Sequence, residues 1–215
     1  MPFVEIYHRV ANHVRDAGGD PVFYPGNPIS NANIKKLRSK SAIPVPDSLI
    51  DFYREVGDGV FFYWKRKSDG AYGCMSFPKL RELIVPSLDV LKWRLEWSDS
   101  YDYRFTKDPN LARGTASRMR GWLGFSEEGN GDRFCIETGN GSGDVVFDKH
   151  DWMDGGTGHN GTRFGSTLLE FVEAWSQVCF MAPKCCWWPS VITKSGGVDW
   201  ASTEFPEGFR LGSAS

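Results

Sequence analysis

The sequence predicts an α+β fold, in which helices from the N-terminal and C-terminal parts of the chain pack against an antiparallel sheet. Three observations favour this class: amphipathic helical patterns occur before residue 57, short strands separated by glycine-rich turns occur within 122–147, and a further amphipathic helix follows them. Separate runs of helices and strands are typical of α+β domains, whereas alternating helices and strands are typical of parallel α/β sheets.

Three helices are expected before residue 57. The first ends at Gly18-Gly19, and its apolar residues recur at helical spacing, namely Phe3, Ile6, Tyr7, Val10 and Val14. A shorter helix begins at Ser30, with Ile34 and Leu37 directed inward. The third helix follows Pro46 and has the clearest apolar face, formed by Leu49, Phe52, Tyr53 and Val56.

The next segments alternate between strand signals and polar sequence. An aromatic run at 60–64 and a second segment at 72–77 are predicted strands, and Pro78 occupies a position that favours the start of a helix. Residues 98–118 are polar and lack a period, so we interpret them as a long connection.

An antiparallel meander is expected in the second half, because segments dense in turn residues separate three short strands at 122–125, 133–137 and 145–147. A loop at 149–164 leads to a closing helix that begins with a capping box formed by Thr167 and Glu170. Its apolar stripe comprises Leu168, Phe171, Val172, Trp175 and Cys179. We assign residues 1–181 to a single domain and 182–215 to a C-terminal extension, because the aromatic residues of the tail show no period.

The composition excludes several classes of protein. The 25 basic and 27 acidic residues give a net charge of −2, which excludes a strongly basic nucleic-acid binder and a polyacidic disordered tail. The chain contains no apolar run of the length that spans a membrane, and its first residues do not resemble a secretory signal. Five cysteines cannot all pair within one chain, so we expect free thiols and a cytoplasmic location.

No residue spacing predicts catalysis, a cofactor or a metal site. Cys179, Cys185 and Cys186 lack a C-x-x-C spacing, and we interpret them as residues that pack at the end of a helix. A loop rich in acidic and histidine side chains lacks the H-E-x-x-H spacing, and its members are Asp148, His150, Asp151, Asp154 and His159. We interpret this loop as solvated charge, with metal-dependent hydrolysis as the alternative.

Negative charge is concentrated in one part of the chain. Residues 126–154 contain eight acidic and two basic side chains, whereas 58–120 have a net charge of +4. Carboxylates in turns are expected to project into solvent, and a basic partner relieves their mutual repulsion. The predicted partner-binding residues are therefore Glu127, Glu128, Asp132, Asp144, Asp148, Asp151 and Asp154, with Trp152 as an apolar anchor. The alternative is an ordinary surface of solvated turn carboxylates.

Three blocks carry a resemblance to a known family. Residues 45–61 run from Val-Pro through an apolar helix to Gly-Asp-Gly before a strand, residues 122–151 contain the meander, and Ser166–Phe171 begin the closing helix. In this order the blocks resemble the SUKH superfamily (Smi/Knr-like proteins) over roughly residues 28–180. Val45 and Asp58 replace the leucine and asparagine that are usual in the family.

The resemblance implies a binding module without catalysis. Many bacterial members of this superfamily are cytoplasmic immunity proteins that neutralise a cognate toxin, often a nuclease, and fungal members regulate wall synthesis. The first hypothesis is therefore an immunity protein that occludes the active site of a toxin, with no nucleic acid or membrane as partner. A small metal-dependent hydrolase and a non-catalytic intracellular regulatory scaffold are the alternatives. The resemblance does not identify the toxin, because partner surfaces diverge while the scaffold stays.

Overall fold

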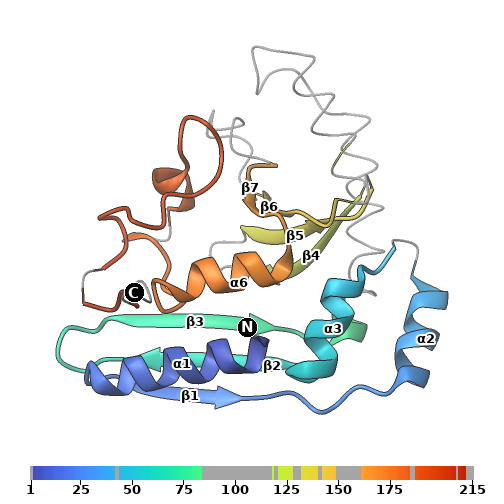
Figure 1. Ribbon diagram of the computed structural model, residues 1–215, viewed down its shortest axis with the longest axis horizontal. Helices are drawn as coiled ribbons and strands as arrows, with labels where there is room; N and C mark the ends of the chain where they lie inside the picture. Colours follow the sequence, from blue (N-terminus) through green and yellow to red (C-terminus); the bar gives the residue numbers. More distant parts are fainter. Residues whose placement is uncertain are drawn as a thin grey trace.

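Two antiparallel sheets form the framework of the computed structural model, which confirms the α+β class (Figure 1). The structure describes residues 2–41, 44–83, 118, 121–127, 132–139, 142–148, 161–184, 187–206 and 208–211. The first sheet has the order β1-β2-β3 and consists of Asp20–Tyr24, Val60–Lys65 and Tyr72–Phe77. The second has the order β4-β5-β6-β7 and consists of Trp122–Glu127, Arg133–Glu137, Val145–Asp148 and Arg163–Gly165.

The predicted helices are present with nearly the expected bounds. They are α1 (Phe3–Asp16), α2 (Asn31–Lys40), α3 (Asp47–Glu55) and α6 (Leu168–Ser176), and a 3-10 helix, η4, spans Trp188–Val191. The Thr167 hydroxyl accepts a hydrogen bond from the Glu170 N–H, as the capping box requires. The Glu170 carboxylate accepts from the N–H of Ser166 rather than of Thr167, so the second half of the box forms one residue earlier.

Helix α1 covers one face of the first sheet. The side chains of β2 alternate strictly, so that Val60, Phe62 and Trp64 are buried against the core. Tyr7 of α1 stacks on Phe23 of β1, with ring centroids 4.9 Å apart. The sequence did not predict β1, because Pro21 lacks a backbone donor and is tolerated only in an edge strand such as this one.

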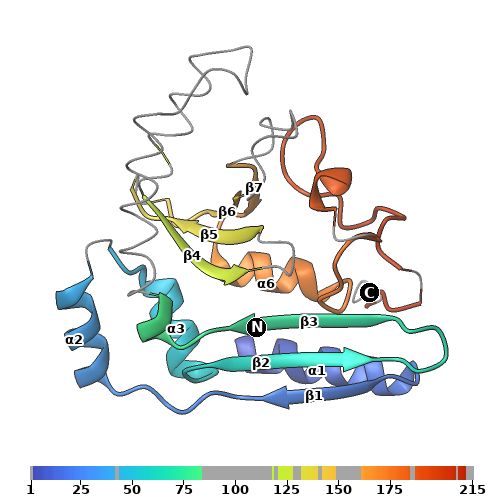
Figure 2. The ribbon, with the colours of Figure 1, turned by 180° about the vertical axis from the view of Figure 1, so that it is seen from behind.

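Helix α6 lies between the two sheets in both views, and one continuous core joins them (Figures 1 and 2). The ring of Phe77 in β3 stacks on Phe125 in β4, with centroids 5.1 Å apart and an angle of 11° between the ring planes. Phe134 of β5 contacts both Phe171 and Trp175 of α6. Leu168, Phe171, Val172 and Trp175 of the predicted apolar stripe are therefore buried in this core, whereas Cys179, the last residue of the predicted stripe, lies in the turn after α6.

Residues beyond 181 also contribute to this core. The sequence assigns them to a C-terminal extension, and four of their apolar side chains are at most 2% exposed, namely Trp188, Val191, Phe205 and Phe209. The position of the domain boundary at 181 stays a prediction. The connection expected at 98–118, apart from Arg118, lies outside the described residues, as do Cys185, Cys186 and most of the loop at 149–164.

Candidate partner-binding surfaces

Two carboxylates of the predicted acidic surface are buried. Asp132 is 0% exposed and Asp148 is 5% exposed, so the expectation that they project into solvent is wrong. Asp148 is the last residue of β6 and pairs in register with Arg133 of β5, and its Oδ2 lies 4.0 Å from the Cys135 sulfur. Strand pairing, rather than turn geometry, therefore determines where the Asp148 carboxylate lies.

A third carboxylate of the same stretch is held in an internal ion pair. Glu137 is 2% exposed and accepts two hydrogen bonds from the guanidinium of Arg118, at 2.9 Å to Oε1 and 2.7 Å to Oε2. The hydrogen bond to Glu137 raises the pKa of Arg118 above its usual value. Such bidentate pairs fix two segments relative to each other, so Glu137 holds β5 to the segment that contains Arg118.

Of the remaining predicted site residues, only Asp144 has a described side chain. Asp144 is half-buried, and its backbone N–H donates to the Ser142 hydroxyl. The Glu127 side chain lies outside the described residues, together with Glu128, Asp151, Trp152 and Asp154. Of the predicted acidic residues, only Asp132, Asp144 and Asp148 have described side chains, and the role of the set in binding stays a prediction.

The alternative hydrolase needs a cluster of metal ligands. Within the described ranges, the structure contains no group of three or more His, Cys, Asp or Glu side chains that is able to hold a metal ion. His150, Asp151, Asp154 and His159 of the loop lie outside those ranges. In the same described part of the chain, none of the helices has the length and apolar character needed to cross a membrane.

The outer face of the first sheet is a surface that the sequence did not predict. We call it the aromatic face. It is the side opposite α1 and comprises Asp20, Val22, Tyr24, Phe61, Tyr63, Lys65, Tyr72, Cys74 and Ser76. Figure 2 shows the three strands in front of α1 with no described helix over them. Large rings on this face reach solvent, with exposed fractions of 63% for Tyr24, 40% for Phe61 and 49% for Tyr72.

Three aromatic rings form a row across the strands of this face. Tyr24 of β1 is opposite Phe61 of β2, with centroids 6.4 Å apart and ring planes 26° apart. Phe61 and Tyr63 follow along β2, with centroids 6.3 Å apart and planes 15° apart. Because every residue from Phe61 to Trp64 is aromatic, the sequence alone does not distinguish the exposed rings from the buried ones. Recognition of β1, which pairs with β2, would have supplied the missing information.

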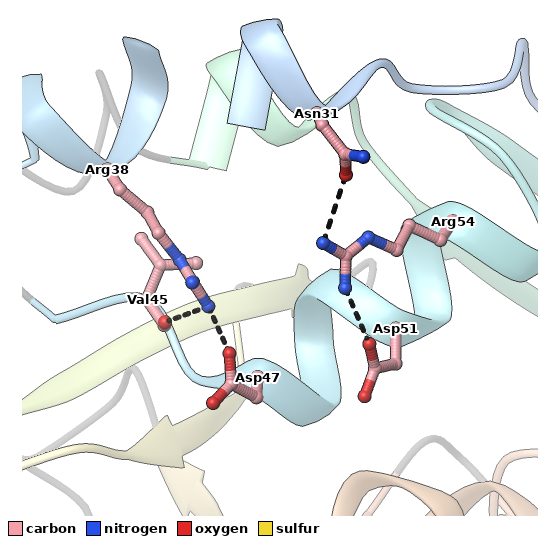
Figure 3. Close-up of polar contacts among 6 residues, drawn as sticks. All are labelled: Asn31, Arg38, Val45, Asp47, Asp51 and Arg54. Carbon is pink, nitrogen blue, oxygen red and sulfur yellow. Dashed lines mark hydrogen bonds and ion pairs between the residues drawn. The ribbon is translucent and has the colours of Figure 1, made fainter. Parts of the chain in front are cut away.

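Side chains at one end of the sheet are fixed by ion pairs. Figure 3 shows that Arg38 of α2 donates to the Val45 carbonyl at 3.3 Å and to the carboxylate of Asp47. Arg54 of α3 likewise donates to Asp51 at 3.0 Å and to the side-chain carbonyl of Asn31 at 3.1 Å. These contacts hold α2 against α3. Apolar packing contributes little to this, since Ile34 is the only fully buried residue of α2.

Carboxylates near the aromatic face are engaged in similar contacts. Asp69 accepts two hydrogen bonds from Arg66 and one from the Ala71 N–H, which lower the pKa of Asp69 to about 2. Asp58 accepts from the Leu80 N–H at 2.6 Å, and Glu82 accepts from the Lys79 N–H at 3.0 Å. These carboxylates are therefore already engaged by donors within the chain.

Lysines carry the charge that remains. Five exposed lysines form no ion pair within the described residues. They are Lys35, Lys36 and Lys40 of α2, and Lys65 and Lys67 at the far end of β2. Of the carboxylates between residues 20 and 83, all of which are described, only Asp20 makes neither a hydrogen bond nor an ion pair. Apart from Asp20, which lies opposite Lys65 on the face, the exposed charges around the aromatic face that lack a described ion pair are consequently positive.

Comparison with known proteins identifies one family. The sequence model described as the SMI1 / KNR4 family (SUKH-1) matches residues 28–173, which is about two thirds of the chain. The match begins after β1 and ends within α6. No curated protein and no solved structure shows significant similarity to the chain.

Proposed function

Because the chain belongs to the SMI1/KNR4 family (SUKH-1), we propose that it is a non-catalytic immunity protein that binds and neutralises a cognate bacterial toxin. The family match over residues 28–173 is the observation that carries this proposal. The exposed rings of the aromatic face support it, since exposed apolar patches on folded proteins commonly mark interaction sites. Binding over the toxin's active site or substrate path blocks the toxin without any chemical step.

We further propose that the protein acts in the cytoplasm. Cys74, Cys135 and Cys179 are free thiols in the structure, and free thiols persist in reducing compartments. This supports the location that most immunity proteins of the superfamily occupy.

Protection of cells tests the proposal directly. The full chain is expressed in susceptible cells together with each toxin encoded beside its gene, and survival is compared with cells that carry an empty vector. We expect survival with one such toxin. Trp175→Ala is the matched negative control, because Trp175 is 1% exposed and its removal disrupts the core. Absence of both protection and binding against every neighbouring toxin contradicts the proposal.

Stoichiometry distinguishes binding from catalysis. When purified protein is titrated into a fixed amount of active toxin, a binding inhibitor abolishes toxin activity at about one chain per toxin chain. A hydrolase inactivates many toxin molecules per chain and leaves the toxin covalently altered, which intact-mass measurement detects. Loss of protection in His150→Ala, together with stoichiometric metal in the wild-type protein, favours the hydrolase.

A further inference from the structure

We propose that the toxin docks on the aromatic face, and that its complementary surface has an apolar centre flanked by carboxylates. This inference rests on the proposed immunity function and names the surface that performs it. It assigns the partner the opposite charge from the one that the acidic stretch at 126–154 predicts.

The apolar part of the argument is the cost of leaving these rings in water. Tyr24, Phe61 and Tyr72 are each at least 40% exposed and lie on the same side of a single sheet. Single exposed apolar residues are common, but neighbouring large rings on one sheet face, such as Tyr24 and Phe61, are typical of protein interfaces. Aromatic side chains are enriched at binding hot spots because they bury a large area while losing little rotational freedom.

The strands hold these rings in place before any partner arrives. Phe61 lies between Val60 and Phe62, which are 1% and 0% exposed, so the backbone beneath its ring is anchored in the core. The same alternation anchors Tyr72 through buried Gly73 of β3. A preorganised surface loses less conformational entropy on binding, which favours tight association.

The face itself, rather than the sheet edge, is the part suited to docking. β1 is the edge strand of its sheet, and Pro21 removes one of the backbone donors that an added strand needs. The opposite edge is covered in part by the chain after α6, since the Cys74 N–H donates to the Phe180 carbonyl at 3.0 Å. Side-chain contacts on the face therefore have to supply the affinity.

Charge determines which kind of protein fits. Lys65 belongs to the face, Lys67 follows it in the turn, and the lysines of α2 lie beyond the other end of the sheet, where β1 ends (Figures 1 and 2). Lysines at both ends, to which the described residues supply no ion pair, attract a partner with carboxylates on either side of its apolar centre. The same charges disfavour a second copy of this chain, because face-to-face contact sets lysine against lysine, and of the carboxylates between residues 20 and 83 only Asp20 lacks a described partner.

Affinity measurements on the full chain test the apolar part. The probe is the toxin against which the wild-type protein protects, in a catalytically inactive form, and Kd is measured by titration calorimetry. The variant Tyr24→Ser/Phe61→Ser/Tyr72→Ser is expected to weaken Kd at least about 30-fold. Trp187→Ser is the matched control, since Trp187 is 44% exposed but is not part of the face, and its Kd should stay within about threefold of wild type.

A second pair of variants tests the charge. Lys65→Glu/Lys67→Glu is expected to lower the association rate constant about tenfold at low salt and to weaken its dependence on salt. Lys184→Glu/Lys194→Glu makes the same charge change at exposed lysines of the tail and is expected to leave the rate nearly unchanged. All variants are first compared with wild type by circular dichroism and urea unfolding, so that a folding defect is not taken for a binding defect.

The outcomes separate this inference from the proposed function. Wild-type binding that the triple aromatic variant retains overturns the aromatic face as the interface and leaves the immunity function intact. Loss of binding in Glu127→Lys/Glu128→Lys, with retention in the aromatic variant, assigns the interface to the acidic stretch. If the wild-type chain binds no toxin encoded beside its gene, both the proposed function and the proposed docking surface are wrong.

Discussion

The indole N–H of Trp64 donates a hydrogen bond of 2.7 Å to the backbone carbonyl of Cys179, which lies 115 residues later in the chain. Trp64 belongs to the first sheet, and Cys179 belongs to the turn that follows α6. Cys179 and Phe180 both adopt positive φ, at 51° and 57°, a conformation that is unfavourable for residues other than glycine. Contacts from the sheet and the tail therefore hold a turn that its own residues disfavour.

Replacement of Trp64 by phenylalanine should destabilise the protein strongly. Trp64→Phe removes the only ring N–H at this position and leaves the Cys179 carbonyl without its donor in a buried site. An unsatisfied buried acceptor costs about 1–3 kcal/mol, and the smaller ring adds a cavity cost. Urea unfolding measures the loss in the free energy of unfolding.

The control for this experiment is the same substitution at a surface tryptophan. Trp187→Phe changes a side chain that is 44% exposed, and we expect a change within about 0.5 kcal/mol. Equal free energies of unfolding for the two variants contradict the role assigned to the Trp64 hydrogen bond.

Residues of the tail should be as important for stability as those of the central domain. Phe209 is 0% exposed, its ring centroid lies 4.1 Å from that of Trp64, and the Arg66 guanidinium stacks 4.2 Å above it. Phe209→Ala should therefore cost about 3–5 kcal/mol in the free energy of unfolding. Phe61→Ala is the matched control and should cost less than about 1 kcal/mol, because Phe61 is 40% exposed. A Phe209 variant as stable as the Phe61 variant indicates a tail that is dispensable for folding.

Helices and strands with local signals were predictable from the sequence, whereas features set by distant contacts were not. The periodic apolar face of α3 and the cap at Thr167 depend on residues within one turn of each other, and both are confirmed. β7 has only three residues, and pairing with β6 alone defines it. The burial of Asp148 was missed because all four residues of β6 are buried, which alternation does not predict. The core role of Phe209 was missed because the tail has no period.

The thiol of Cys179 should be inert in the folded protein. Burial raises the pKa of this thiol to about 12, and the S–H donates to the Phe209 carbonyl at 2.9 Å. Because the thiolate is the reactive form, alkylation by iodoacetamide at neutral pH should reach Cys179 only through unfolding. Peptide mapping by mass spectrometry, with and without urea, measures this. Alkylation of Cys179 in the native protein at the rate of a free thiol contradicts the assignment.

The same pKa shift has a consequence for stability at alkaline pH. In the unfolded chain the thiol ionises near its ordinary value of 9.0, whereas in the folded protein it keeps its proton up to about pH 12. The folded state therefore binds more protons in this interval, and stability falls as pH rises from about 9 to 12. Cys179→Ala should unfold with a shallower loss of stability over this range than wild type, as measured by urea unfolding at a series of pH values.

Two arginine–carboxylate ion pairs show how burial of the carboxylate changes the contribution of the pair to the free energy of unfolding, because the two arginines are almost equally exposed. The Arg118 side chain is 45% exposed and pairs with Glu137, which is 2% exposed, whereas the Arg54 side chain is 48% exposed and pairs with Asp51, which is 62% exposed. Removal of an arginine leaves a buried carboxylate without compensation in the first case and a solvated one in the second. Uncompensated buried charge costs about 3–5 kcal/mol, whereas exposed pairs contribute at most about 1 kcal/mol.

We therefore expect Arg118→Met to lower the free energy of unfolding several times more than Arg54→Met, as measured by urea unfolding at neutral pH. The double variant Arg118→Met/Glu137→Met removes the stranded charge together with its partner, and should recover much of the stability that the single variant loses. This recovery distinguishes the cost of an unpaired carboxylate from the loss of packing around Arg118, which the double variant does not restore. Equal losses for Arg118→Met and Arg54→Met indicate instead that water reaches Glu137 once the guanidinium is gone. The burial of Glu137 would then depend on Arg118 itself rather than on the strands around it.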